Sequence, residues 1–385
     1  RFPLGAHRRC ILYLMKLFFL LLLFLLPLRI VKAIYDPLSV SNNKYGIHIV
    51  DPNDLTDIPF LLNSSKGDWG YVTLVIPDSD RDIGKWQGIF DQMRRLHLIP
   101  LVRLATHPEG ASWTKPSKED TLAWVKFLSK LNWPIKNRYI ILFNEPNHAK
   151  EWGNTISPEE YASVAVSFAQ ALKTSSEDYF ILPAGLDGSA STNSDSLDES
   201  EFLRRMYSAK PELFTILDGW SSHSYPNPAF SQPPTVLTPI SISSFVYELG
   251  EISKYTNKKL PVFITETGWD REIYTDKVIA SYFKEAIEGV WNNSQIVTVT
   301  PFLLKAGEGP FEKFSVIKGN DGESEIFKEF VNFPKTKGTP AIYPEKKVLG
   351  TEKSNEIPVK DFSNEEKVSG VKNTKKIIKW LLLGL

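Results

Sequence analysis

Residues 138–146 read RYIILFNEP, an apolar run of strand length that ends on Asn144 and Glu145 before a proline. Residues 260–269 read LPVFITETGW, in which a second apolar run leads into Glu266. Nearly continuous runs of Val, Ile and Leu are typical of parallel strands that are covered on both faces. The two stretches therefore predict buried parallel strands, each with a glutamate at its carboxyl end.

Six further segments show the same pattern, and amphipathic segments of helical period follow most of the eight. The predicted strands are 46–50, 71–77, 99–105, 139–144, 180–185, 217–222, 262–265 and 296–303, and the predicted helices are 82–96, 118–131, 158–173, 243–255 and 275–291. Eight strand–helix units in about 290 residues match an α/β protein with one (β/α)8 TIM barrel. A doubly wound open sheet is the alternative, but the first strand runs into Asp51-Pro52-Asn53 rather than a Gly-rich phosphate-binding turn.

The charges of the chain cancel only in total. The 385 residues hold 45 Lys and Arg against 45 Asp and Glu, yet residues 1–33 carry a net charge of +6, residues 34–333 of −11 and residues 334–385 of +5. No net basic field recruits nucleic acid, so we expect no nucleic-acid partner. The single cysteine, Cys10, excludes a disulfide scaffold and a Cys-based metal site.

The two ends of the chain predict export and a tail. Residues 1–33 hold an alternative start, Met15, then Lys16 and an apolar run of about 12 residues, which predicts a secretory signal peptide, with an uncleaved membrane anchor as the alternative. Residues 34–333 form the predicted barrel domain. Residues 334–385 are rich in Lys, Glu, Pro, Thr and Ser and predict a low-complexity tail, which leads into a truncated anchor or a frayed apolar end. We expect a secreted or extracytoplasmic monomer. The alternative is a protein attached to the membrane through its N-terminal segment or its C-terminal end.

Glu145 and Glu266 stand where a barrel carries its working residues, at the carboxyl ends of strands. The fourth and seventh strands lie on opposing parts of the ring, so both side chains can converge on one cleft. By alternation along the strands, Glu145 is expected to share a side with Phe143 and Ile141, and Glu266 with Ile264 and Val262. For either residue alone, a helix cap or a solvated loop acid is the alternative. Two converging carboxylates are the machinery of glycoside hydrolysis.

The two strand ends also carry a family resemblance. Asn144-Glu145-Pro146 and, 121 residues after Glu145, the stretch TETGW at 265–269 resemble the two signature strands of clan A retaining glycoside hydrolases. The resemblance extends over roughly residues 44–333. It implies that Glu145 is the general acid/base, that Glu266 is the nucleophile and that Asn144 hydrogen-bonds the 2-hydroxyl of the sugar.

Four further residues are candidates for the cleft. Residues 221–226 read SSHSYP, and in the clan a His-x-Tyr at this strand implies that Tyr225 holds the nucleophile, with His223 beside it. A buried core pair is the alternative for both. Clan members keep an arginine near the nucleophile, commonly by the second strand, so Arg103 on the third strand is either that residue or part of a surface ion pair. His48 on the first strand is expected at the cleft floor or in core packing.

Exposed aromatic rings are expected in the cleft because they complement the apolar faces of sugars. Trp113, Trp152 and Trp269 fall on the catalytic side, and Trp269 is the preferred sugar platform. Many clan members carry a Trp at the end of the eighth strand, where this chain has Phe302. The six histidines show no His-Glu-x-x-His motif, so we expect neither a metal nor another cofactor.

The sequence therefore predicts a retaining glycoside hydrolase that acts on a β-linked polysaccharide or oligosaccharide. A barrel that binds surface glycan without cleaving it and a transglycosylase with the same residues are the alternatives. The stretch Glu266-Thr267-Gly268-Trp269 is similar to β-1,3-glucanases, whereas Asn144-Glu145-Pro146 is shared by xylosidases, mannanases and cellulases. The glycan and the choice of exo or endo action stay open.

Overall fold

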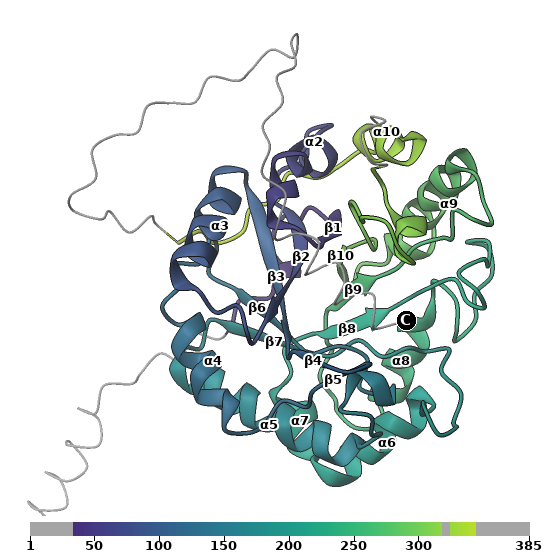
Figure 1. The fold of residues 1–385 in the computed structure, drawn as a ribbon. Helices are drawn as coiled ribbons and strands as arrows, with labels where there is room; N and C mark the ends of the chain where they lie inside the picture. The colour runs from purple at the N-terminus through teal and green to yellow at the C-terminus, as the bar shows by residue number, and fades with distance from the viewer. Residues whose placement is uncertain (1–33, 318–323, 344–385) are drawn as a thin grey trace, which may run out of the picture. The chain divides into compact units, whose positions relative to one another are not determined.

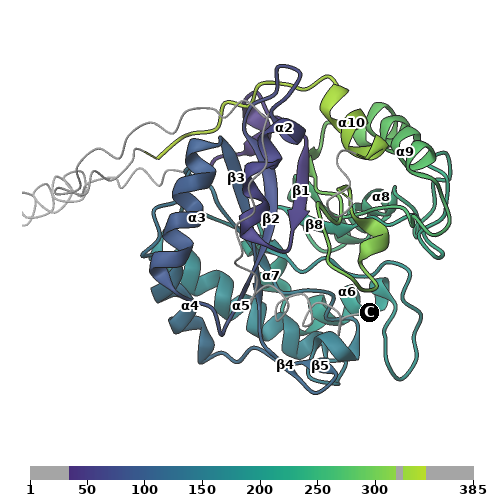
Figure 2. The ribbon, with the colours of Figure 1, turned by 45° about the horizontal axis from the view of Figure 1, so that its top comes forward.

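The computed structural model describes residues 34–317 and 324–343 of the 385-residue chain. Its centre is a ring of parallel strands surrounded by helices, which Figure 1 shows from one end and Figure 2 shows tilted. The predicted signal segment, with Cys10 and Met15, and the predicted C-terminal anchor lie outside the described residues. Within them, no helix is long and apolar enough to cross a membrane.

Eight parallel strands make the ring and confirm the eight predicted ones. They are β1 (Gly46–Ile49), β2 (Gly70–Pro77), β3 (Leu98–Ala105), β6 (Arg138–Leu142), β7 (Tyr179–Pro183), β8 (Trp220–His223), β9 (Val262–Glu266) and β10 (Ile296–Val299). They pair as two arcs in the orders β1-β2-β3-β6-β7 and β10-β9-β8. A parallel bridge from Tyr45 to Val299 joins the arcs on one side, and Asp218 N donates to Ile181 O on the other. The chain is thus a (β/α)8 barrel.

Helices cover the outside of the ring, as Figure 2 shows for α3. The predicted helices correspond to α3 (Ile83–Arg95), α4 (Asp120–Leu128), α5 (Pro158–Ser175), α8 (Ser244–Ile252) and α9 (Asp276–Glu288); α2 (Ile58–Leu62), α6 (Glu199–Ala209), α7 (Pro211–Ile216) and α10 (Glu325–Asn332) were not predicted. Capping fixes the starts: Ser157 accepts from the backbone N–H of Glu160 at 3.3 Å, and Asp82 accepts from that of Lys85 at 2.7 Å.

Two apolar layers hold the barrel together. Inside the ring, Tyr71, Leu101, Tyr139, Phe180 and Phe263 belong to one buried cluster, and the other face of each strand packs against the helices. This double coverage is the physical reason for the continuous apolar runs in the sequence.

The first ten residues of the predicted tail belong to the folded domain. Residues 334–343 run along the amino-terminal side of the barrel strands, where Gly338 N donates to Asp68 O at 3.0 Å and Thr339 N donates to Ser41 O at 2.9 Å. Lys136 N donates to Ala341 O at 2.7 Å, so this segment is paired with three parts of the chain. The polar composition of residues 334–343 does not indicate this pairing, because it is made by backbone hydrogen bonds. The folded barrel domain therefore includes these residues.

Candidate active site

An open cavity lies at the carboxyl ends of the barrel strands, and five polar side chains line its centre: Arg103, Asn144, Glu145, Tyr225 and Glu266. Arg103 lies on β3, Asn144 and Glu145 follow β6, Tyr225 follows β8 and Glu266 ends β9. The fold therefore brings together residues up to 163 positions apart, at the end of the barrel where the sequence predicted a cleft.

Glu145 reaches the cavity because the backbone changes conformation after β6. Phe143 has φ 74° and Glu145 has φ 28°, in a region that non-glycine residues rarely adopt and that is common at functional sites. The ring of Phe143 contacts Phe168 of α5, at 5.3 Å between centroids, and both Phe143 and Glu145 line the cavity. Ile141 belongs to the cluster inside the barrel, so Glu145 lies on the side that alternation predicted for it.

Glu266 leaves its predicted side because the pairing of its strand is irregular. Ile264 packs in the layer between strands and helices, whereas Phe263 points into the barrel. The pairing of β8 with β9 shifts register between Ser222 and His223, so that His223 lies opposite Glu266. This irregularity directs Glu266 to the cavity rather than to the outer layer with Ile264.

Glu266 is held as an anion by its neighbours. Arg103 donates from Nη1 to Oε1 of Glu266, and the Tyr225 hydroxyl donates to Oε2 at 3.1 Å. Burial by itself raises the pKa of Glu266, but His223 and Arg103 outweigh it and lower the pKa to about 2. The carboxylate is therefore ionised at neutral pH, as a nucleophile must be.

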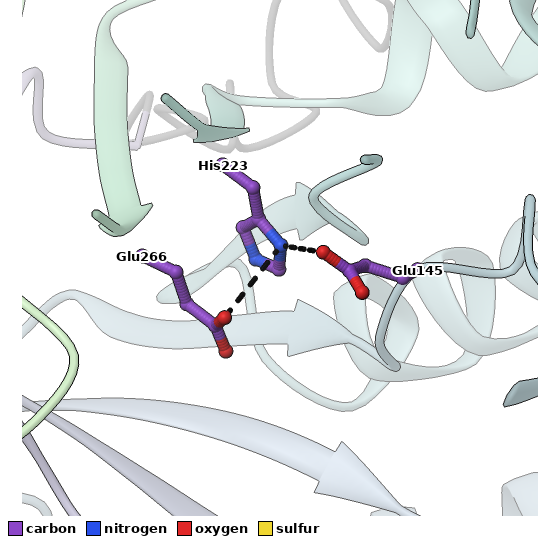
Figure 3. Close-up of side chains that lie close together, drawn as sticks. All are labelled: Glu145, His223 and Glu266. Carbon is purple, nitrogen blue, oxygen red and sulfur yellow. Dashed lines mark hydrogen bonds and ion pairs between the residues drawn. The ribbon is translucent and has the colours of Figure 1, made fainter. Parts of the chain in front are cut away.

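His223 lies between the two carboxylates, as Figure 3 shows. Its Nδ1 is 2.8 Å from Oε1 of Glu145 and 3.8 Å from Oε2 of Glu266. Burial disfavours the charged ring, but Glu266 and Glu145 raise the pKa of His223 overall. The ring packs on Gly185, where an added Cβ would lie 2.2 Å from a ring carbon, so glycine is required at that position.

Asn144 connects Arg103 to a third carboxylate that the sequence did not single out. Oδ1 of Asn144 accepts from Arg103 at 2.7 Å, and Nδ2 donates to Oε2 of Glu151 at 3.2 Å. Glu151 also lines the cavity. Burial, followed by the nearby Glu145 charge, raises the pKa of Glu151 to about 7. One signal could have pointed to this residue, namely a carboxylate six positions after Glu145 in the same loop.

The cluster can be compared with a metal site. Glu145, His223 and Glu266 each offer a ligand atom, and these atoms lie within 4.8 Å of one another. However, Nδ1 of His223 already bonds Glu145, and the Arg103 guanidinium already neutralises Glu266. A divalent cation would replace these contacts and lie beside a buried positive charge. The donor set therefore fits a pair of reacting carboxylates better than a metal.

Residues 111–330, more than half of the chain, match the family model described as the glycosyl hydrolase catalytic core. The chain belongs to this glycosyl hydrolase family. The recognition of a glycoside hydrolase from the two glutamate strands is thereby confirmed. No curated protein sequence matches this glycosyl hydrolase.

Solved structures share the barrel of this glycosyl hydrolase at low sequence identity. A family 39 glycoside hydrolase from Bacteroides cellulosilyticus WH2 has a TM-score of 0.52 and 13% identity; the match covers 77% of this chain and 64%, less than two thirds, of that one. A GH5_18 protein from Bifidobacterium longum subsp. infantis has a TM-score of 0.53 and 11% identity, and the match covers 75% of this chain and 78% of that one. A glucosidase from Croceicoccus marinus has a TM-score of 0.56 and 11% identity, and the match covers 75% of this chain and 67% of that one. These likenesses confirm the fold class.

Two histidines predicted to bind substrate do not line the cavity of the glycosyl hydrolase. His48 is fully buried, its Nδ1 lies 3.8 Å from Oε1 of Glu266, and its ring meets Phe302 edge-on at 5.0 Å. Burial and the Arg103 charge lower the pKa of His48 to about 3, so the ring is neutral. His223 is 4% exposed and contacts the carboxylates. Both rings therefore lie beside the glutamates, beneath the cavity wall.

The predicted tryptophan platforms are mostly wrong. Trp269 is 1% exposed, donates to Gln232 O at 2.8 Å and packs edge-on against Phe283 of α9, so it belongs to the core. Trp152 lines the cavity but is also only 1% exposed. Trp113 lines the cavity and is half-buried, so it stays a candidate platform. The sequence placed these rings on the catalytic side but could not show which way each one packs.

Phenylalanines supply the apolar wall that tryptophans were expected to make. Phe230, Phe302, Phe311 and Phe314 line the cavity together. Their rings contact one another, with Phe230 edge-on to Phe314 at 5.0 Å and Phe302 edge-on to Phe311 at 5.2 Å. Phe302 follows β10, at the position where many clan members carry a Trp. The cavity therefore has an aromatic wall beside Glu266 and Tyr225.

Proposed function

We propose that this glycosyl hydrolase is a retaining enzyme that cleaves β-linked glycans by double displacement. The observation that carries the proposal is a distance: one oxygen of Glu145 and one of Glu266 lie within 4.8 Å of one another. Retaining glycosidases hold their carboxyl groups about 5–5.5 Å apart, whereas inverting ones leave about 6.5–9.5 Å for a water molecule. The short separation supports a nucleophile and an acid/base.

In the first step, an oxygen of Glu266 attacks the anomeric carbon while the bond to the leaving oxygen breaks. Glu145 gives its proton to that oxygen, so the leaving group departs as an alcohol and a glycosyl ester forms on Glu266. His223 supports this role because its Nδ1 lies 2.8 Å from Oε1 of Glu145 and holds that carboxyl group in place. Arg103 and Tyr225 fix the angle of attack of Glu266 through its two oxygens.

In the second step, Glu145, now a carboxylate, takes a proton from water, and the hydroxyl oxygen attacks the anomeric carbon. The ester bond to Glu266 breaks, the sugar leaves with its original configuration and both glutamates return to their first states. Asn144 is placed to bond the 2-hydroxyl of the reacting sugar, a contact that strengthens in the transition state. The balance of the two steps is hydrolysis and requires no cofactor.

Product analysis on glycans of defined linkage tests this function. We expect the purified chain to release reducing ends from at least one of β-glucan, xylan, mannan and galactan. Binding to a glycan without any release of reducing ends would instead favour a non-catalytic binding barrel. Products longer than the starting oligosaccharide would favour a transglycosylase, which uses a sugar in place of water in the second step.

A further inference from the structure

Glu151 is a buried carboxylate in the wall of the active-site cavity, and neither step of the proposed mechanism uses it. It closes the short 3-10 helix η3 (Ala149–Glu151), is 8% exposed and directs Oε2 to Nδ2 of Asn144 at 3.2 Å. A carboxylate is expensive to bury, and such groups are kept where they have a specific partner. Its partner here is the residue beside the proposed acid/base.

The turn that carries Glu151 is fixed on both sides. The Ser112 hydroxyl on β5 (Ser112–Trp113) donates to the backbone carbonyl of Lys150 at 2.8 Å. Trp152 packs against Phe143 and Tyr161, with ring centroids 6.0 and 5.4 Å apart. Both neighbours of Glu151 along the chain are therefore anchored, and the position of its carboxylate is set by the fold rather than by a flexible loop.

The two partners of Asn144 determine which way its carboxamide faces. Arg103 can only donate, so it must meet Oδ1, and an acceptor oxygen of Glu151 must meet Nδ2. If the Asn144 amide were flipped, its NH2 group would face the N–H of Arg103, and its oxygen would face the carboxylate oxygen of Glu151. This arrangement leaves the second N–H of Asn144 free to donate into the cavity.

Arg103 extends the connection to the nucleophile, because the same Nη1 also donates to Glu266. Glu151, Asn144, Arg103 and Glu266 therefore form a continuous chain of hydrogen bonds along the cavity. Burial and the Glu145 charge raise the pKa of Glu151 to about 7, and both the protonated and the ionised forms keep an acceptor oxygen for Asn144.

We propose that Glu151 is a positioning residue that orients the Asn144 carboxamide so that its second N–H meets the hydroxyl next to the anomeric carbon. This inference rests on the proposed function, since it assigns Glu151 to the transition state of that reaction. It acts through Asn144 and does not itself contact the reacting atoms.

A double-mutant cycle between Glu151 and Asn144 tests this role. With the aryl β-glycoside that the wild type cleaves best, Glu151→Leu should lower kcat about 10-fold or more with little change in KM, because the lost orientation matters in the transition state. In the Asn144→Ala background, the same change should alter kcat by less than about 2-fold. Glu151→Gln, which keeps an acceptor oxygen, should stay within about 3-fold of the wild type.

Thermal unfolding separates positioning from a structural role. Glu151→Leu leaves Nδ2 of Asn144 without its acceptor, so Tm is expected to fall by a few degrees, whereas a structural role would lower it much further. Full loss of kcat from Glu151→Leu in both backgrounds, or no loss in either, would overturn the inference. A wild type that cleaves no glycan would overturn the proposed function and this inference with it. An active wild type with an inactive Glu266→Gln variant and no coupling between Glu151 and Asn144 would overturn the inference alone.

Discussion

Glu266→Gln is expected to lower kcat by at least about 10⁴-fold, or about 5.5 kcal/mol in the barrier, with the barrel intact. The amide has the shape of the carboxylate, but it cannot form the glycosyl ester. Oε1 of the glutamine can still accept from Arg103, and its amide nitrogen can donate to the Tyr225 hydroxyl. Steady-state kinetics with the best substrate from the glycan panel, together with circular dichroism, measures both parts of this result.

Glu285→Gln is the matched control for this variant. It makes the same chemical change on an exposed glutamate of α9 that is not among the residues lining the cavity. Its kcat should equal that of the wild type. Hydrolysis by Glu266→Gln at the wild-type rate would show that another group attacks the sugar, and the assignment of the nucleophile would fail.

Glu145→Ala is expected to affect the two chemical steps differently. For a glycan, whose leaving alcohol needs a proton, kcat/KM should fall about 10²–10⁴-fold, the usual contribution of general acid catalysis. For a 2,4-dinitrophenyl glycoside, whose leaving group needs no proton, kcat/KM should change less than about 10-fold. The kcat for that activated substrate should still fall, because no base then activates water in the second step.

Rescue by added azide distinguishes the loss of an acid/base from a structural effect of Glu145→Ala. As a small anionic nucleophile, it needs no base and can enter the space left by the Glu145 side chain. It should restore turnover of the dinitrophenyl substrate by Glu145→Ala and yield a β-glycosyl azide. An equal loss of kcat/KM on both substrates, without rescue, would indicate that Glu145 supports the structure and does not transfer a proton.

The sequence predicted the barrel well because its strands are covered on both faces. Each strand is a nearly continuous apolar run, and this signal does not depend on the register of neighbouring strands. The same runs ended on Glu145 and Glu266, so the two proposed catalytic residues were found from their place at strand ends. Arg103 and Tyr225 were expected near the nucleophile from the clan resemblance, and both contact Glu266 in the structure.

The direction of Glu266 relative to its own strand could not be predicted, because simple alternation fails at the end of β9. Ile264 packs in the outer layer, whereas Glu266 lines the cavity. The pairing of β8 with β9 shifts register between Ser222 and His223, beside Glu266. Such a shift depends on the neighbouring strand, which the pattern of a single strand does not contain.

Side-chain exposure was the other failure. Trp269 follows β9, yet it packs in the core against Phe283 of α9 and Trp291. Glu151 was missed for the opposite reason, since a charged residue in a loop is usually solvated. Only the packing of Trp152 and the bond to Asn144 show that this carboxylate lies in the wall of the site.

Proton NMR of the first product tests the retaining mechanism most directly. The wild type is mixed with its best β-glycoside, and the anomeric proton of the released sugar is followed before mutarotation. A double displacement through Glu266 predicts that the β-anomer appears first and that the α-anomer grows only at the rate of mutarotation. Initial formation of the α-anomer would contradict the double displacement and the assignment of Glu266 as the nucleophile.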